Sequence, residues 1–125
     1  MSTRQKGFSL IELLIVVAII LVIAAIAIPN LLRAQIAANE SSAVGSVRSI
    51  VTAEETYNSS WGIGYSTNLA NLGGALPCVA SPATACLIDP VLSGGTKSGY
   101  TINAIGGAAA GGVVQLTLSM PCQSP

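Results

Sequence analysis

The stretch KGFSLIELLIVVAIILVIAAIAI, residues 6–28, decides how this chain of 125 residues is organised. From 13 to 28 no residue carries a polar side chain, and only Ser9 and Glu12 interrupt the apolar run that begins at Phe8. As a helix this run is about 32 Å long, enough to cross the ~30 Å hydrocarbon core of a bilayer. The sequence therefore predicts a membrane-spanning helix close to the N-terminus.

A short basic leader precedes the apolar run, and a glycine separates the two. A secretory signal peptide places its apolar core before the cleavage site and small residues at the site itself. Here the order is reversed, so cleavage after Gly7 would remove residues 1–7 and leave the hydrophobic helix on a mature protein that begins at Phe8. Arg4 and Lys6 favour a cytoplasmic N-terminus by the positive-inside preference, which predicts that the C-terminal domain lies outside.

Glu12 is the unusual residue of the apolar run. A charged carboxylate near the bilayer interior costs a few kcal/mol on insertion scales and normally has a partner. One interpretation is that Glu12 lies near the interface and reaches water. The other uses the α-amino group that cleavage creates on Phe8, because the ammonium of one subunit can neutralise Glu12 of a neighbour once helices pack side by side. That second interpretation gives Glu12 a role in assembly and axial register, with a smaller favourable term from the helix dipole.

The helical pattern continues beyond the apolar segment, 8–28, as an amphipathic half over residues 29–60. Pro29 removes one backbone donor and clashes with the carbonyl four residues back, so we expect a kink or local melting over 25–29. Glu54 and Glu55 are adjacent and face apart on a helix, which favours a solvated face over a paired-carboxylate site. Apolar residues recur at three- and four-residue steps or their multiples and predict a buried stripe, with the charged residues largely off it: Ile36, Val44, Val47, Ile50, Val51 and Tyr57, against Arg33, Glu40, Arg48 and Glu55.

Residues 61–125 predict a small head of loops and strands. Proline and glycine interrupt its first half repeatedly, which is typical of loops. Two short helical turns are expected there. One is capped by Thr67 and stopped by Gly73, and the other begins at Asp89 and Pro90, a capping acceptor followed by a residue of fixed φ.

Two strands complete the head. Polar and apolar residues alternate over 100–105 and 114–120, and the glycine-rich segment 106–112 can turn the chain between them. Because an isolated hairpin is marginal in water, its apolar face must pack on the Val47 and Val51 side of the helix. The predicted fold class is α+β, a long, kinked N-terminal transmembrane helix with a small head containing a two-stranded antiparallel sheet.

Three cysteines, Cys78, Cys86 and Cys122, follow the membrane segment. The face beyond a membrane is oxidising, so one disulfide is expected with one thiol left over. A bridge from Cys78 to Cys86 closes the smallest loop, whereas a bridge to Cys122 ties the chain end to the head. We favour a bridge to Cys122, because a free tail gains most from tethering, but the sequence leaves both pairings open.

Composition argues against several function classes. Five basic and five acidic residues give a net charge of zero without a basic stripe, so no electrostatic case for nucleic-acid binding exists. The chain has no histidine, the commonest general base and metal ligand. The glycines of 94–95 and 106–112 lack the spacing of a phosphate-binding loop. We therefore predict no catalytic residue, no cofactor and no metal site, and we do not expect an enzyme.

At residues 7–20, GFSLIELLIVVAII, and 24–30, AAIAIPN, the chain resembles the type IV pilin and pseudopilin family. The resemblance implies cleavage after Gly7 by a membrane-bound prepilin peptidase and N-methylation of Phe8. It also implies assembly by an ATPase-driven inner-membrane machine into a homo-oligomeric helical filament with the α-helices inside.

The chain departs from this family in two respects. The family often has glycine where this chain has Leu21, so the extent of unwinding around Pro29 is left open. Its head usually carries a four-stranded antiparallel sheet, whereas two strands are predicted here. That difference implies a reduced head or an early chain end at residues 122–125, and both make neighbouring subunits more important for stability.

Three functional hypotheses follow. The first is a pilus subunit, held in the bacterial inner membrane as a precursor and then part of a cell-surface filament for adhesion, motility or DNA uptake. The alternative within the family is a pseudopilin of a type II secretion system, which shares the motif. The third is a singly anchored periplasmic enzyme. It would require a polar constellation in the outer domain, and none is visible in the sequence.

Overall fold

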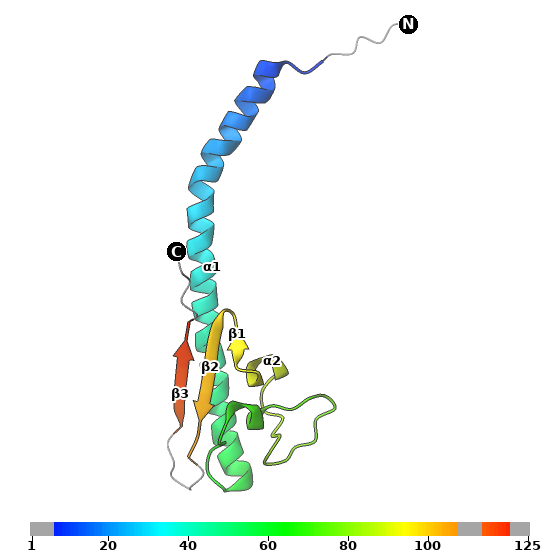
Figure 1. Cartoon of the computed structure of the whole chain (residues 1–125), viewed down its shortest axis with the longest axis vertical. Helices are drawn as coiled ribbons and strands as arrows, with labels where there is room; N and C mark the ends of the chain where they lie inside the picture. Colours follow the sequence, from blue (N-terminus) through cyan, green and yellow to red (C-terminus); the bar gives the residue numbers. More distant parts are fainter. Residues whose placement is uncertain (1–6, 108–113, 121–125) are drawn as a thin grey trace, which may run out of the picture. The chain divides into compact units, whose positions relative to one another are not determined.

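The computed structural model describes residues 7–107 and 114–120 (Figure 1). The chain forms two compact units, Met1–Ala37 and Ala38–Pro125. Helix α1, Leu10–Trp61, contributes to both of them, and the remaining elements all belong to the second unit. The predicted α+β class, a long apolar N-terminal helix followed by a small antiparallel sheet, is confirmed.

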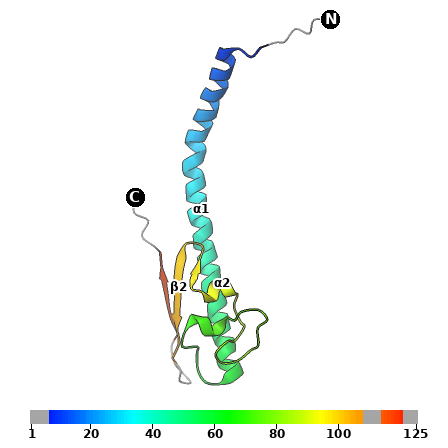
Figure 2. The same ribbon diagram turned by 45° about the vertical axis from the view of Figure 1, so that its right-hand side comes forward.

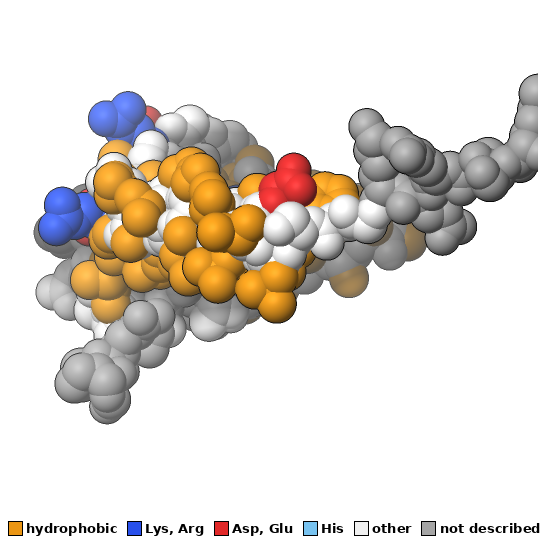
Figure 3. Space-filling model, turned by 90° about the horizontal axis from the view of Figure 1, so that it is seen from above, with side chains coloured by type: hydrophobic (Ala, Val, Ile, Leu, Met, Phe, Trp, Pro, Cys, Tyr) orange, Lys and Arg blue, Asp and Glu red, His pale blue; other side chains and the backbone are white. Residues whose placement is uncertain are grey.

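In the first unit α1 is a bare hydrophobic rod. Its first turn is closed by the carbonyl of Ser9, which accepts from the N–H groups of Glu12 (3.1 Å) and Leu13 (3.2 Å). The helix has an eighteen-residue window of mean hydropathy 3.3, none of which is buried within the chain, and it is long and apolar enough to cross a membrane. Figure 3 shows hydrophobic side chains over most of the described surface that faces the viewer. Such a surface requires lipid or other chains around it.

Pro29 lies inside α1, and the helix continues through it. A proline in a helix interior deprives the carbonyl four residues back of its donor. The expected kink or local melting over 25–29 stays a prediction.

In the second unit α1 buries a face that differs from the predicted stripe. Ile50 and Tyr57 are buried as expected, at 0% and 3% exposure. Val44 and Val51, however, are exposed, at 52% and 45%, and in the first unit Ile36 is exposed as well. The rest of the buried face consists of small or polar residues: Ala43, Ser46, Ala53 and Glu54.

The loop after α1 contains the two short helical turns. The first, η1, spans Leu69–Leu72, and its cap is Asn68 rather than the predicted Thr67, since the side chain of Asn68 accepts from the N–H of Asn71 (3.1 Å). Gly73 ends this turn as expected. The second, α2, spans Pro90–Ser93 and begins at Asp89, whose carboxylate accepts from the N–H of Leu92.

Within the described residues the sheet has three antiparallel strands in the order β1-β2-β3: β1 Thr96–Lys97, β2 Tyr100–Ile105 and β3 Gln115–Ser119. The two predicted strands are β2 and β3, paired in the register Ile102 with Leu118. The structure adds β1, joined to β2 through Ser98 and Gly99, both at positive φ (54° and 79°), which suits a tight hairpin turn. A strand of two residues has no alternation by which a sequence could reveal it.

One core holds the second unit together. The buried side chains of β2 alternate as predicted, and Ile102 and Ala104 belong to one core with Ile50 of α1. Val47 is half-buried, and Val51 lines a cavity together with Leu116 of β3. Figure 2 shows β2 and α2 beside the second half of α1. The core joins α1, the loop and the sheet through nine buried residues: Ile50, Ala53, Tyr57, Leu69, Leu72, Ala85, Leu92, Ile102 and Ala104.

Candidate functional site

The predicted cleavage site lies just ahead of helix α1. Gly7, Phe8 and Ser9 are outside regular secondary structure and exposed, Phe8 at 80%. A peptide bond in such a segment can enter a protease without any helix having to unwind. A Cβ added at Gly7 would meet no atom within 4 Å, so the chain's own packing does not require glycine there.

Glu12 follows in the first turn of α1, one turn after Phe8. Its side chain is exposed among apolar neighbours, including Ile11 at 66% and Leu13 at 60% exposure. Within the described residues the single ion pair joins Lys97 and Asp89 at 3.7 Å, on the surface of the second unit. Among residues 7–107 and 114–120, Glu12 has no ion-pair partner.

The second unit holds a carboxylate that sequence reasoning misplaced. Glu54 was expected on a solvated face, yet only 1% of it is exposed. One of its oxygens accepts from the N–H of Ser66 (2.8 Å) and the other from the Ser66 hydroxyl. Ser66 is fully buried. Glu55, by contrast, is exposed as expected. The Glu54 carboxylate thus ties α1 to the loop that follows it.

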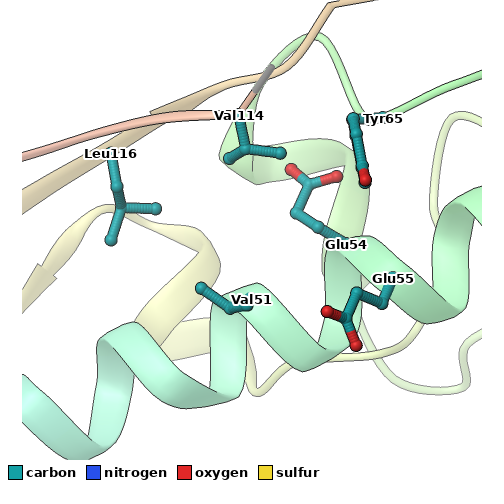
Figure 4. Close-up of a pocket in the computed structure, with 6 residues that line it drawn as sticks. All are labelled: Val51, Glu54, Glu55, Tyr65, Val114 and Leu116. Carbon is teal, nitrogen blue, oxygen red and sulfur yellow. The ribbon is translucent and has the colours of Figure 1, made fainter. Parts of the chain in front are cut away.

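An open cavity of about 270 Å³ lies beside Glu54. Figure 4 shows the residues around it, from α1, the loop and the start of β3: Val51, Glu54, Glu55, Tyr65, Val114 and Leu116. Both Glu54 oxygens already accept hydrogen bonds, and the chain has no histidine to serve as a base. Within the described ranges no three His, Cys, Asp or Glu side chains gather to hold a metal ion. Nothing in this lining assembles a nucleophile and base.

The disulfide joins Cys78 and Cys86, so the preference for a bridge to Cys122 was wrong. Cys122 itself lies outside the described residues. The physical reason is that the loop folds back on itself. The N–H groups of Ala85 (2.7 Å) and Leu87 (2.8 Å) donate to carbonyls of residues 71 and 72, which brings Cys86 to within 6.1 Å of Cys78 between Cα atoms.

Neighbouring residues contact the disulfide and the loop that it closes. A Cβ at Gly74 would collide with the sulfur of Cys78, so only glycine leaves room for the bridge at that point. The Tyr57 hydroxyl donates to the carbonyl of Pro82 (2.8 Å), which holds the disulfide-closed loop against α1. These contacts give the loop a fixed place in the second unit.

The N-terminal segment carries a motif found in known proteins. Residues 2–28 match the family described as the prokaryotic N-terminal methylation motif. The match includes Gly7, Phe8 and Glu12 and stops one residue before Pro29, so the resemblance inferred from the sequence is confirmed for this segment. The roles of the individual residues within it stay predictions.

Two curated relatives are similar to this chain over a little less than half of its length. The chain is 46% identical over 56 residues to the type IV major pilin protein PilA of Myxococcus xanthus, covering 45% of this chain and 26% of that protein. It is 48% identical over 54 residues to the type IV wide pilus major component PilA4 of Thermus thermophilus, covering 43% of this chain and 41% of that protein. The chain thus spans less than half the length of either relative. No solved structure matches it.

Proposed function

We propose that this chain is a type IV pilin, a non-enzymatic structural subunit that is cleaved after Gly7, methylated on Phe8 and polymerised through α1 into a filament at the cell surface. The observation that carries the proposal is the order of the N-terminal features. An exposed glycine and aromatic residue lie directly ahead of a bare apolar helix whose first turn holds an acid. Cleavage at that point creates an amino group beside the acid and leaves the rod on the protein.

The exposed rod supplies the adhesion between subunits. In lipid the helices gain nothing from the hydrophobic effect by associating, so close van der Waals packing of their apolar faces drives assembly. The residues available for this packing are exposed by about half or more, including Leu14 at 61% and Val22 at 64%. Non-directional packing of this kind does not by itself set how far one helix slides along another.

The Phe8 and Glu12 pair supplies one fixed register. Four residues of helix rise about 6 Å, so the new ammonium of one subunit reaches the carboxylate of a neighbour displaced by about one turn. At 4 Å and an effective dielectric constant of 20 this attraction is about 4 kcal/mol, similar to the few kcal/mol that a charged carboxylate costs in the membrane. A subunit with its acid paired is therefore more stable in the filament than alone in the bilayer.

The proposal includes a route through the membrane. The precursor is held in the inner membrane by α1 with its leader on the cytoplasmic side, where a prepilin peptidase and methyltransferase acts on it. An ATPase-driven machine then extracts subunits into the filament. The length and hydropathy of the helix support the membrane step. The names of the two relatives, a major pilin and a major pilus component, favour a pilus over a secretion pseudopilus.

The test examines the mature N-terminus and the acid together. Mass spectrometry of filaments sheared from the cells should show a chain that begins at methylated Phe8. An intact Met1 or a cut at another bond would refute the processing step. Glu12→Val should enter the membrane normally but yield at least tenfold fewer filaments, whereas Glu12→Asp, which keeps the charge, should retain part of the yield. Normal filaments from Glu12→Val would remove the pairing role.

A further inference from the structure

A row of exposed residues runs along α1 in the second unit, on a flank of the helix next to its buried face. Its members are spaced by four, four, three and four residues, which places them on one helix face, and we name this row the charged stripe: Glu40, Val44, Arg48, Val51 and Glu55. All five are exposed, whereas Ile50 on the core side is fully buried. Figure 4 shows Val51 and Glu55 on consecutive turns of α1.

The stripe has the composition of an interface between chains. Two valines at 52% and 45% exposure alternate with three charges of alternating sign, acid, base, acid. Arg48 has no ion-pair partner among the residues that the structure describes, where the single pair is Lys97 with Asp89. The stripe flanks the core face of α1: Val51 and Glu55 border the open cavity beside Glu54, and all five side chains stay exposed, which leaves them available to another chain.

The charges determine how two copies of the stripe can align. Side by side, parallel and level, each residue meets itself, so Arg48 faces Arg48 and each acid faces an acid. Displacing one copy by seven to eight residues removes these repulsions. Glu40 then lies level with Arg48 of the neighbour, and Arg48 lies level with Glu55. The same displacement brings Val44 beside Val51. A single shift therefore pairs each acid with a base and one valine with another.

We propose that the charged stripe is the surface by which a second copy of this chain packs beside the first in the filament, staggered by seven to eight residues. The stagger is about 10.5–12 Å along the helix at 1.5 Å per residue. This rests on the proposed function, because a polar filament supplies the parallel orientation. The same face of every helix can turn toward a common axis, as in a parallel bundle, while the stagger makes each contact heterologous and so extends the array.

The stagger is longer than the one-turn displacement that brings Phe8 to Glu12. A helical array gives each subunit neighbours at more than one axial displacement, and the two contacts belong to different neighbours. The apolar rod provides adhesion without register, the N-terminal pair fixes one neighbour, and the charged stripe fixes another. Like-charge contacts at a level alignment also disfavour the simplest competing arrangement, an untwisted bundle of helices in register.

Cysteine cross-linking in filaments measures the stagger directly. Chains carrying Val44→Cys or Val51→Cys are prepared with Cys122→Ser, so that the new thiol is the reporter. Filaments that contain both chains should give covalent dimers on oxidation at least tenfold more often than filaments of either chain alone. Dimers formed equally by Val44→Cys alone would show a level or antiparallel contact and would overturn the proposal.

Charge inversion tests the same register without new thiols. Arg48→Glu sets an acid against Glu40 and Glu55 of two neighbours, so filament yield should fall at least tenfold. The triple variant Glu40→Arg, Arg48→Glu, Glu55→Arg inverts every pair and should restore the yield to within twofold of the wild type. Lys97→Glu is the matched control, with the same change in net charge outside the stripe, and it should leave the yield within twofold.

These outcomes separate the two proposals. Absence of filaments from the wild-type chain contradicts the proposed function. Wild-type filaments together with a triple variant that stays as defective as Arg48→Glu contradict the stripe while leaving the function intact. A mixture of wild-type and charge-inverted chains should form separate filaments, because each contact between the two kinds of chain brings like charges together.

Discussion

Replacing Ser66 by alanine should destabilise the second unit by about 2 kcal/mol, the size of a hydrogen bond to a charged group. The Ser66 hydroxyl donates to Glu54, and both residues are essentially inaccessible to solvent, at 0% and 1% exposure. Ser66→Ala keeps the backbone N–H bond of 2.8 Å to the other carboxylate oxygen but leaves one oxygen with nothing to accept from. Because only 1% of Glu54 is exposed at the wall of the open cavity, solvent replaces little of the lost donor, and most of the desolvation penalty is felt.

Trp61 reports the unfolding of this unit. It is the sole tryptophan of the chain, and its ring centroid lies 4.9 Å from that of the buried Tyr57. Urea unfolding of the full chain in detergent micelles, followed by Trp61 fluorescence, gives the free energy of unfolding of the second unit. For a unit of this size, 1 kcal/mol corresponds to about 4–8 °C in Tm, so Ser66→Ala should lower Tm by roughly 8–16 °C.

A control variant and a double-mutant cycle test whether the lost hydrogen bond causes the destabilisation by Ser66→Ala. Ser49→Ala removes an exposed hydroxyl that bonds only to the helix carbonyl of Gly45, and it should change stability by less than about 0.5 kcal/mol. Glu54→Ala should cost more than Ser66→Ala, and the double variant should show a coupling energy of about 1–2 kcal/mol. A Ser66→Ala effect as small as that of Ser49→Ala, or additive single effects, would refute the reasoning.

Two further predictions concern the loop and the helix. Non-reducing peptide mapping should recover Cys78 linked to Cys86, and Cys86→Ser should cost about 2–3 kcal/mol by releasing a short closed loop; a peptide linking either cysteine to Cys122 would contradict this pairing. Gly74→Ala should destabilise the second unit by about 1–3 kcal/mol because its Cβ collides with the Cys78 sulfur. Gly45→Ala, where an added Cβ meets nothing within 4 Å, should instead stabilise α1 by about 1 kcal/mol. Equal effects of the two alanines, measured by the same urea unfolding, would show that the collision at Gly74 is relieved at no cost.

The features that the sequence predicted well are those whose cause is local. The apolar run from Phe8 to 28 is long enough by itself to define the rod, and the position of Gly7 ahead of it is visible without any tertiary contact. In the same way Asp89 followed by Pro90 carries its own helix-start chemistry, and α2 begins there. The predicted alternation of buried and exposed residues in β2 is confirmed, because one face of that strand is buried and the other is exposed.

The features that the sequence did not reveal depend on partners distant along the chain. Glu54 is buried because Ser66, twelve residues later, satisfies both of its oxygens, and no periodicity marks such a pair. Backbone hydrogen bonds fold the loop back and so bring Cys86 to Cys78. The wrong prediction of a bridge to Cys122 considered only the entropy of the C-terminal tail. Asn68 replaced Thr67 as a cap for a similar reason, since both side chains suit the role and the turn geometry selects between them.

The buried face of α1 differs from the predicted stripe for a physical reason. A helix that served only its own core would place its valines inward and its small residues outward. In α1 the core takes Ile50 and Tyr57, but it also takes Ala43 and Ala53 while Val44 and Val51 stay exposed. Small residues permit close approach of the sheet and loops. In our proposal the exposed valines contact another copy of the chain in the filament. In our proposal α1 therefore packs on two partners, the core of its own chain and a second copy of the chain. The order acid, base, acid along the exposed side sets the axial position of that second copy.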